Sequence, residues 1–266
     1  MKNRVVALFS NQTERSLETQ ELLEKKLQKA GFQVIQTFDK QAELVVCIGG
    51  DGAFLQALHQ CGFPQVPFLG INTGHLGFFQ EYMPDCLDQC IENYRAGSFG
   101  IQSLATAQAE ISHNKGEETL YALNEVVIRT GNSYTVHLSI SIGGSFIERF
   151  SGDGVCVATP AGSTGYNYSL GGSIVDPRLK VLQVTPIAPM NTTAYRSFTS
   201  SLLLPAELFL GVVPEESYEQ IHVAVDSIEK KYEEVQEIRV KISDKTVNLI
   251  RFESYDFWNK VKTKFL

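Results

Sequence analysis

A glycine-rich tetrapeptide, Gly49-Gly50-Asp51-Gly52, is the part of the sequence best suited to chemistry. It directly follows the apolar run Leu44–Ile48, which predicts a buried strand. Glycines let backbone N–H groups approach a phosphate closely, and a following helix N-terminus favours negative charge. A carboxylate repels phosphates unless it binds a metal or accepts a proton from a nucleophile. We therefore expect Asp51 to have one of these two roles. The alternative is a tight turn in which Asp51 caps the next helix.

A second loop, residues 72–79 (NTGHLGFF), follows the predicted strand Pro67–Ile71. Because ligands bind beyond the carboxyl ends of strands in an open α/β sheet, we expect this loop to lie beside the first one. The alternative is structural: Gly74 and Gly77 shape a turn, and Phe78 fills the core.

A polar pair, Asn124-Glu125, interrupts the apolar run Tyr121–Ile128. Such a pair is costly within a strand unless it is satisfied, which points to partners such as ribose hydroxyls or a neighbouring backbone. An edge strand explains the pair equally well.

A dense Gly/Ser/Thr/Tyr stretch at residues 159–172 follows a predicted strand, Val155–Thr159, and a Ser151–Gly154 turn. Its hydroxyls, backbone N–H groups and aromatic planes suit a nucleobase and phosphates; a flexible loop is the alternative. Asp226 ends a later predicted strand and, taken alone, is typical of a turn.

Several function classes are excluded or disfavoured. The sequence has no G-x-G-x-x-G after a strand, no G-x-x-x-x-G-K-[ST], no G-x-S-x-G and no H-E-x-x-H. The net charge of −7 and the lack of a Lys/Arg cluster argue against nucleic acid. The five cysteines show no zinc spacing, and no apolar run is long enough to cross a membrane, so we expect a cytoplasmic protein without a membrane partner.

The first hundred residues alternate between strands and helices, which predicts a parallel sheet covered by helices. We expect Asn11 and Glu14 to form a capping pair for a helix that stops at Gly31. We expect Asp85 to cap a second helix that ends at Gly97. The predicted strands are 4–9, 32–38, 44–48 and 67–71, and a further short helix is predicted at 54–61.

From about residue 101 the pattern becomes rich in strands, and only Thr164–Leu170 has a helical pattern. We predict strands at 134–142, 155–159, 181–186, 202–204, 221–226, 235–242 and 247–252, and a C-terminal aromatic helix at 257–261. The expected fold class is an α/β N-terminal domain with a parallel sheet plus an all-β, β-sandwich-like C-terminal domain. The expected divisions are 1–100, 101–240, and a tail, 241–266, that returns to the first domain.

Taken together, these motifs resemble the NAD kinase family, which is grouped with diacylglycerol kinases and 6-phosphofructokinases. The motifs follow the order of the family over about 180 residues: GGDG at 49–52, NTGHLGF at 72–78, LNE at 123–125, GDG at 152–154, TPAGSTGYNYSLGG at 159–172 and VD at 225–226. The resemblance implies transfer of a phosphoryl group from ATP to the 2′-hydroxyl of the adenosine ribose of NAD, giving NADP. It also implies Mg²⁺ or another divalent cation, and a homodimer or homotetramer assembled mainly through the second domain.

The resemblance also implies roles for individual residues, while the metal ligands are not predicted. Asp51 would be the general base and, with Gly52, face the reacting ribose, and Gly49, Gly50 and Gly52 would form the phosphate loop. Asn124 and Glu125 would hold ribose or pyrophosphate, and Asp153 would lie at the nicotinamide end of NAD. Thr164, Tyr166 and Ser169 would lie on the adenine side. The remaining NAD-binding positions would be Phe78, Ala188 and Asp226.

Three positions depart from the family pattern: Ala53 stands where Thr is usual, Gly165 where Ala is usual, and Ser151 where a basic residue is frequent. These departures leave the preference for donor and acceptor open. Two other functions remain as alternatives, a lipid or sphingoid kinase on the same fold and a regulatory module that binds NAD(H) or NADP(H) without turnover.

Overall fold

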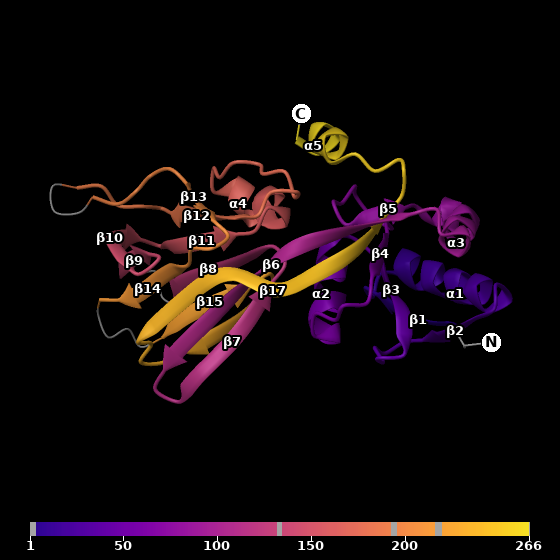
Figure 1. Cartoon of the computed structure of the whole chain (residues 1–266), viewed down its shortest axis with the longest axis horizontal. Helices are drawn as coiled ribbons and strands as arrows, with labels where there is room; N and C mark the ends of the chain where they lie inside the picture. The colour runs from indigo at the N-terminus through magenta and orange to yellow at the C-terminus, as the bar shows by residue number, and fades with distance from the viewer. Residues whose placement is uncertain (1–3, 132–134, 193–195, 216–219, 266) are drawn as a thin grey trace. The chain divides into compact units, whose positions relative to one another are not determined.

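The computed structural model describes residues 4–131, 135–192, 196–215 and 220–265 (Figure 1). The chain divides into two compact units: unit 1 comprises residues 1–103 and 246–266, and unit 2 comprises residues 104–245. Residues 246–266 thus belong to the unit formed by the start of the chain. None of the helices in the described part is both long and apolar enough to span a membrane.

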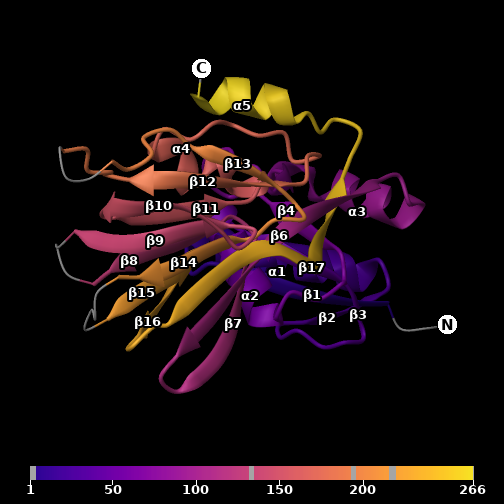
Figure 2. The same ribbon diagram turned by 60° about the vertical axis from the view of Figure 1, so that its left-hand side comes forward.

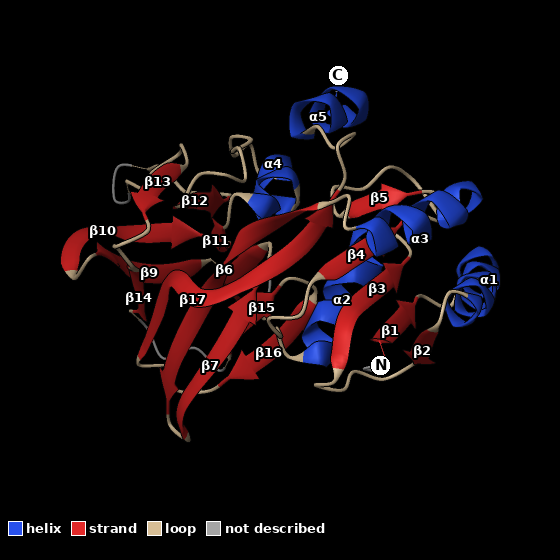
Figure 3. Ribbon diagram, turned by 45° about the vertical axis from the view of Figure 1, so that its right-hand side comes forward, coloured by secondary structure: helices blue, strands red, loops and turns tan. Residues whose placement is uncertain are grey.

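Unit 1 is built on a parallel sheet in the order β2-β1-β3-β4, with β5 and the end of β17 (Glu237–Arg251) also paired to β4. Helices α1 and α3 lie on one side of these strands and α2 lies on the other (Figures 1 and 3). The bounds are β1 Arg4–Ser10, α1 Glu14–Lys29, β2 Phe32–Ile35, β3 Ala42–Ile48, α2 Asp51–Cys61, β4 Phe68–Ile71, β5 Gln80–Tyr82, η1 Pro84–Cys86, α3 Leu87–Ala96 and α5 Phe257–Phe265.

The two faces of the sheet in unit 1 follow from the alternation of side chains along its strands. Val6 and Leu8 of β1 share a buried cluster with Leu23 and Leu27 of α1 and with Ile91 of α3. Strands buried on both faces are typical of parallel sheets covered by helices, which explains the near-continuous apolar runs in this part of the sequence.

Unit 2 contains two antiparallel sheets whose inner faces share one hydrophobic core. One sheet pairs β10-β9-β14-β17 with the β6–β7 hairpin, and the other has the order β13-β12-β11-β8-β15-β16 (Figure 2). The bounds are β6 Gly100–His113, β7 Gly116–Ala122, β8 Glu125–Thr130, β9 Val136–Ile142, β10 Ser145–Gly152, β11 Gly154–Ala158, η2 Ala161–Thr164, α4 Tyr166–Ser169, β12 Val181–Ile187, β13 Leu202–Pro205, β14 Leu210–Pro214, β15 Ile221–Val225, β16 Ile228–Tyr232 and β17 Glu237–Arg251.

The core of unit 2 is formed by alternate residues of each strand, as expected when two sheets pack face to face. Val136, Leu138 and Ile140 of β9 point inward from the first sheet, and Val155 and Val157 of β11 point inward from the second. The α/β class of unit 1 and the β-sandwich class of unit 2 confirm the predicted fold class.

Some local predictions were wrong. Thr13, not Asn11, is the N-cap of α1, and the Asn11 side chain instead accepts a hydrogen bond from the Thr13 hydroxyl (2.9 Å). Asp85 does not cap α3, because it lies inside the 3-10 turn η1 that precedes this helix. The two strands predicted at 235–242 and 247–252 form the single 15-residue strand β17. Tyr134, the first residue of another predicted strand, lies outside the described residues.

Candidate active site

The glycine-rich tetrapeptide joins β3 directly to α2, and Asp51 is the first residue of this helix. The predicted loop is therefore shorter than expected, because Gly50 takes the extended N-cap conformation and the helix begins three residues earlier than the apolar pattern suggests. Gly49 has φ +146°, and a Cβ added there would lie 2.5 Å from the Cβ of Ala53. Glycine is required at this sharp strand-to-helix turn.

The Asp51 carboxylate does not cap its own helix but binds the second predicted loop. Its Oδ1 accepts hydrogen bonds from the backbone N–H groups of Phe78 (2.9 Å) and Phe79 (3.1 Å), and its Oδ2 also lies 3.1 Å from the N of Phe78. The loops after β3 and β4 are therefore adjacent, as predicted, and the alternative of Asp51 as a helix cap is wrong.

Gly77 allows this close approach. A Cβ added at Gly77 would lie 2.5 Å from Oδ1 of Asp51 and 1.9 Å from Oε1 of Gln80. The Gln80 amide is buried, and among the described residues neither of its polar atoms has a hydrogen-bond partner. Sequence reasoning missed Gln80, since a single Gln between Phe79 and Glu81 carries no signal of burial beside an acid.

Phe78, a predicted NAD-binding residue, is buried within unit 1. Its ring lies 5.8 Å from that of Phe257 and 6.0 Å from that of Phe265, both in α5. Lys264 in the same helix places its Nζ 4.9 Å from the centre of the Phe78 ring and 3.5 Å from Oδ2 of Asp51. The C-terminal helix was predicted, but its contact with Asp51 was not.

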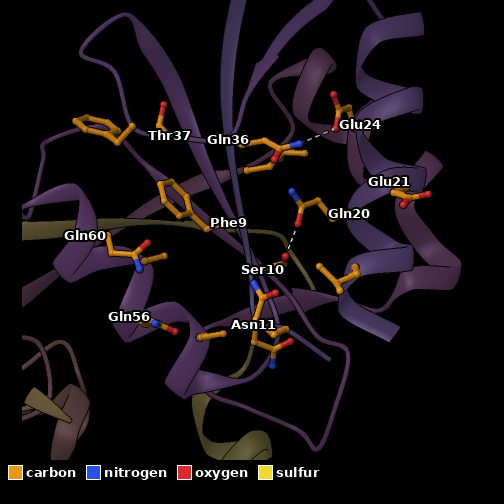
Figure 4. Close-up of a pocket in the computed structure, with 16 residues that line it drawn as sticks. Phe9, Ser10, Asn11, Gln20, Glu21, Glu24, Gln36, Thr37, Gln56 and Gln60 are labelled. Carbon is orange, nitrogen blue, oxygen red and sulfur yellow. Dashed lines mark hydrogen bonds between the residues drawn. The ribbon is translucent and has the colours of Figure 1, made fainter. Parts of the chain in front are cut away.

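A cavity of about 900 Å³ opens beside the tetrapeptide in unit 1 (Figure 4). Its lining comes from the carboxyl end of β1, the segment after β2, and helices α1 and α2. The chain leaves the neighbouring strands β1 and β3 towards opposite faces of the sheet, and open α/β sheets bind ligands at such a switch point. Its lining combines amide side chains with two aromatic rings and contains no Lys or Arg. The residues that line it are Leu8, Phe9, Ser10, Asn11, Gln12, Leu17, Gln20, Glu21, Glu24, Gln36, Thr37, Phe38, Ala53, Gln56, Ala57 and Gln60.

In unit 2, Asp226 fixes the backbone of the predicted Leu-Asn-Glu motif. Its carboxylate accepts hydrogen bonds from the backbone N–H groups of Leu123 (3.1 Å) and Asn124 (2.7 Å), and its own N–H donates to the Glu125 carbonyl (2.9 Å). Asp226 has φ +53°, which only a few non-glycine residues adopt. Asp226 is a turn acid, as its sequence context indicates, and it positions two other candidate site residues.

The side chains of Asn124 and Glu125 do not make all the hydrogen bonds that their oxygens can accept. Among the described residues, Oδ1 of Asn124 and Oε2 of Glu125 are buried without a hydrogen-bond partner. Burial, followed by repulsion from Asp226, raises the pKa of Glu125 to about 8, against a smaller lowering by the Tyr166 backbone. Buried polar atoms without a partner are uncommon, and these two oxygens can accept hydrogen bonds from a bound molecule.

The Gly/Ser/Thr/Tyr stretch packs against this pair and is ordered as the short turns η2 and α4. The Thr159 hydroxyl donates to the Leu123 carbonyl, and a Cβ at Gly162 would lie 2.1 Å from the Asn124 carbonyl oxygen. Thr164, Tyr166 and Ser169 lie in these turns, and the Tyr166 side chain is exposed.

Asp153 and Ala188 lie away from the Asn124–Glu125 pair. The register pairs Ala158 with Glu125 at one end of β11, while Asp153 precedes the other end and its N–H donates to the Ile187 carbonyl. The five residues of β11 separate the two groups by about 17 Å, so a ligand that contacts both must be long and extended.

No group of three or more His, Cys, Asp and Glu side chains within the described ranges could hold a metal ion. Both carboxylate oxygens of Asp51 already accept backbone hydrogen bonds. The residues around Asp51 therefore do not form a cation cage of the kind that carboxylates make for Mg²⁺.

The fold and these motifs define a two-domain kinase, and comparison with known proteins identifies its family. The family models for the ATP-NAD kinase N-terminal and C-terminal domains match residues 2–99 and 123–252. An NAD kinase of Finegoldia magna is 37% identical over 99% of this chain and 98% of its own, and one of Staphylococcus epidermidis is 34% identical over 88% of each chain. The chain belongs to the NAD kinase family, as predicted.

Two solved structures share the fold. Yeast NADH kinase in complex with NADH matches with a TM-score of 0.85 at 20% identity, covering 98% of this chain and 87% of its own. An NAD kinase from Archaeoglobus fulgidus in complex with ATP matches with a TM-score of 0.79 at 22% identity, covering 97% and 99%.

Proposed function

We propose that this chain transfers the γ-phosphoryl group of ATP to the 2′-hydroxyl of the adenosine ribose of NAD, with Asp51 as the general base. The 2′-oxygen forms a new bond to the γ-phosphorus, the bond from this phosphorus to the β–γ bridging oxygen breaks, and ADP leaves. The hydroxyl proton goes to the Asp51 carboxylate. This proposal depends above all on the Asp51 carboxylate, which two backbone N–H groups hold in one orientation at the carboxyl end of a strand.

Positioning explains why a weak base suffices. Phosphoryl transfer depends chiefly on alignment and on stabilisation of charge, and the proton leaves the nucleophile late. The fixed orientation of Asp51 supplies part of this alignment before substrate binds, because Oδ1 is engaged by Phe78 and Phe79. The less engaged oxygen, Oδ2, is then the one that accepts the proton.

Unit 2 supplies the binding groups for NAD in this proposal. Asn124 and Glu125 offer buried oxygens that ribose hydroxyls would satisfy. Tyr166, with Thr164 and Ser169, binds the adenine side. The nicotinamide end extends along β11 towards Asp153 and Ala188, since only an extended dinucleotide contacts both ends of this strand.

The cavity at the switch point of unit 1 is proposed as the site of the ATP base and ribose. Amide side chains of Gln20, Gln36, Gln56 and Gln60 can both donate and accept hydrogen bonds, and Phe9 offers an aromatic plane (Figure 4). The phosphates would extend from there to the glycine-rich turn. A divalent cation would enter with the phosphates of ATP and be held mainly by them and by water.

A filled cavity tests the donor site. Gln60→Trp should raise the KM for ATP while leaving the KM for NAD near that of the wild type, because the added ring occupies space proposed for the base. Gln89→Trp on α3, outside the lining, is the control. Equal KM values for ATP in the two variants would exclude the cavity as the donor site.

The activity itself is tested by incubating the purified chain with NAD, ATP and Mg²⁺ and measuring NADP. Production of NADP supports the proposal and excludes a regulatory module without turnover. Turnover of a lipid alone would favour the lipid kinase alternative. A homodimer or homotetramer and a cytoplasmic location also belong to the proposal; the five free thiols suit a reducing compartment.

A further inference from the structure

The face of α5 that is turned towards the loops of unit 1 carries two ammonium groups. Lys260 and Lys264 are four residues apart and therefore share one side of the helix. Lys260 is largely buried and donates a hydrogen bond to the Gln80 carbonyl, and burial lowers its pKa to about 8. Lys264 is more accessible and lies 3.5 Å from Oδ2 of Asp51. The last turn of α5 thus places the Lys264 ammonium beside the proposed base.

The two oxygens of Asp51 have different surroundings. Oδ1 accepts N–H bonds from both Phe78 and Phe79, whereas Oδ2 shares the Phe78 N–H and faces the Lys264 ammonium. A carboxylate has about four lone-pair sites, so Oδ2 retains capacity for a further hydrogen bond. The side chains of Asp51 and Lys264 are 25% and 35% exposed, which leaves the pair accessible to a ligand.

The approach of the donor creates an electrostatic problem at this point. The tetrapeptide and the 72–79 loop contain no Lys or Arg, and the cavity beside them has none in its lining. The negative charge of Asp51 would repel the γ-phosphate that must come within reach of it. Of the other charged groups around this pair, Glu81 of β5 and Arg251 of β17 form a 2.6 Å ion pair, and Lys260 lies 3.9 Å from the same Glu81 oxygen. Lys264 is the cation that lies 3.5 Å from Oδ2 of Asp51.

We propose that Lys264 is a positioning residue of the active site, whose ammonium offsets the charge of Asp51 and so lets the polyanionic phosphoryl donor approach it. This inference rests on the proposed function. Lys264 acts through Asp51. Its ammonium lies over the Phe78 ring, and Phe265 stacks on the same ring, which holds the end of α5 in place. The C-terminal helix is therefore part of the catalytic apparatus as well as a cover for Phe78.

A double-mutant cycle with binding as its readout tests this role. The measurement is the Kd for a non-hydrolysable ATP analogue in the wild type, Lys264→Met, Asp51→Asn and the double variant. Lys264→Met should weaken binding about fivefold, the effect of a partly exposed charge pair. In the Asp51→Asn background the same substitution should change Kd less than twofold, because the charge that Lys264 offsets is gone. An equal loss in both backgrounds would overturn the proposal.

Two further variants separate charge from structure. Lys262→Met removes the same charge from an exposed position on the same helix and should leave Kd unchanged, whereas Lys264→Arg should restore most of the loss. Binding in Lys264→Met equal to that in Lys262→Met, or tighter than in the wild type, would contradict the inference. Failure of the wild type to make NADP would contradict the proposed function instead.

Discussion

At the scale of residues, the proposed function depends on two carboxylates, those of Asp51 and Glu125, whose surroundings differ. Asp51 accepts hydrogen bonds from two backbone N–H groups and lies 3.5 Å from the Lys264 ammonium. Glu125 is buried next to Asp226, and its pKa is raised to about 8. The first is suited to accept a proton, and the second can donate a hydrogen bond to a ligand near neutral pH.

Glu125 should make the stability of the protein depend on pH. The folded chain holds this proton up to about pH 8, whereas the ordinary pKa is 4.5, so stability falls as the pH rises between these values. Glu125→Gln removes the titrating group, so its free energy of unfolding should not fall in this way. Relative to the wild type, the free energy of unfolding of Glu125→Gln should therefore rise by roughly 1–3 kcal/mol from pH 5 to pH 8. Urea unfolding of ligand-free protein at both pH values measures this.

The control for this prediction is Glu117→Gln, which changes an exposed glutamate of unit 2. Its stability should follow that of the wild type at both pH values. Curves for Glu125→Gln that run parallel to those of the wild type would show that Glu125 is charged throughout.

At the scale of elements, the loop after β4 positions Asp51 through Gly77. Gly77→Ala places a Cβ 2.5 Å from Oδ1 of Asp51 and should displace the carboxylate. A misplacement of about 1 Å can cost up to ~10²-fold in rate, so we expect kcat to fall roughly 10- to 100-fold. Gly74→Ala in the same loop meets no atom within 4 Å and should keep kcat within about twofold of the wild type. Similar kcat values for the two variants would contradict this role.

Periodicity identified β3, α3 and α5, because their apolar residues recur at the spacing of a strand or helix. It missed the start of α2 at Asp51, since a Gly-Gly-Asp-Gly run is typical of a loop. The contacts of Asp51 with Phe78 and Lys264 join segments far apart in the sequence, and no local pattern indicates them.

At the scale of the molecule, the change from alternating helices and strands to strands alone near residue 100 predicted two kinds of architecture. The long strands β6 and β17, which carry the chain across the boundaries of the units, were not predicted as continuous. In β17, charged and polar residues separate two apolar patches, and the pattern was interpreted as two strands.

The assembly is predicted to be a homodimer or homotetramer. The strand β10 pairs with β9 and lies at one end of its sheet, where Phe146 is 64% exposed and Ile147 is 46% exposed. Exposed apolar edge strands are usually covered. Sedimentation at micromolar concentration should therefore give a dimer or tetramer, and Phe146→Lys should shift it towards the monomer. A monomeric wild type would exclude the prediction.

The most direct test of the account is the turnover of Asp51→Asn. Asparagine keeps an oxygen that can accept the Phe78 and Phe79 hydrogen bonds but cannot act as a base. Since positioned proton transfer contributes about 10²- to 10⁴-fold, kcat for NADP formation should fall at least about 10²-fold. The Kd for NAD should change little, because most of its proposed binding groups lie in unit 2. A folded variant with near-wild-type kcat would contradict the assignment of Asp51 as the general base.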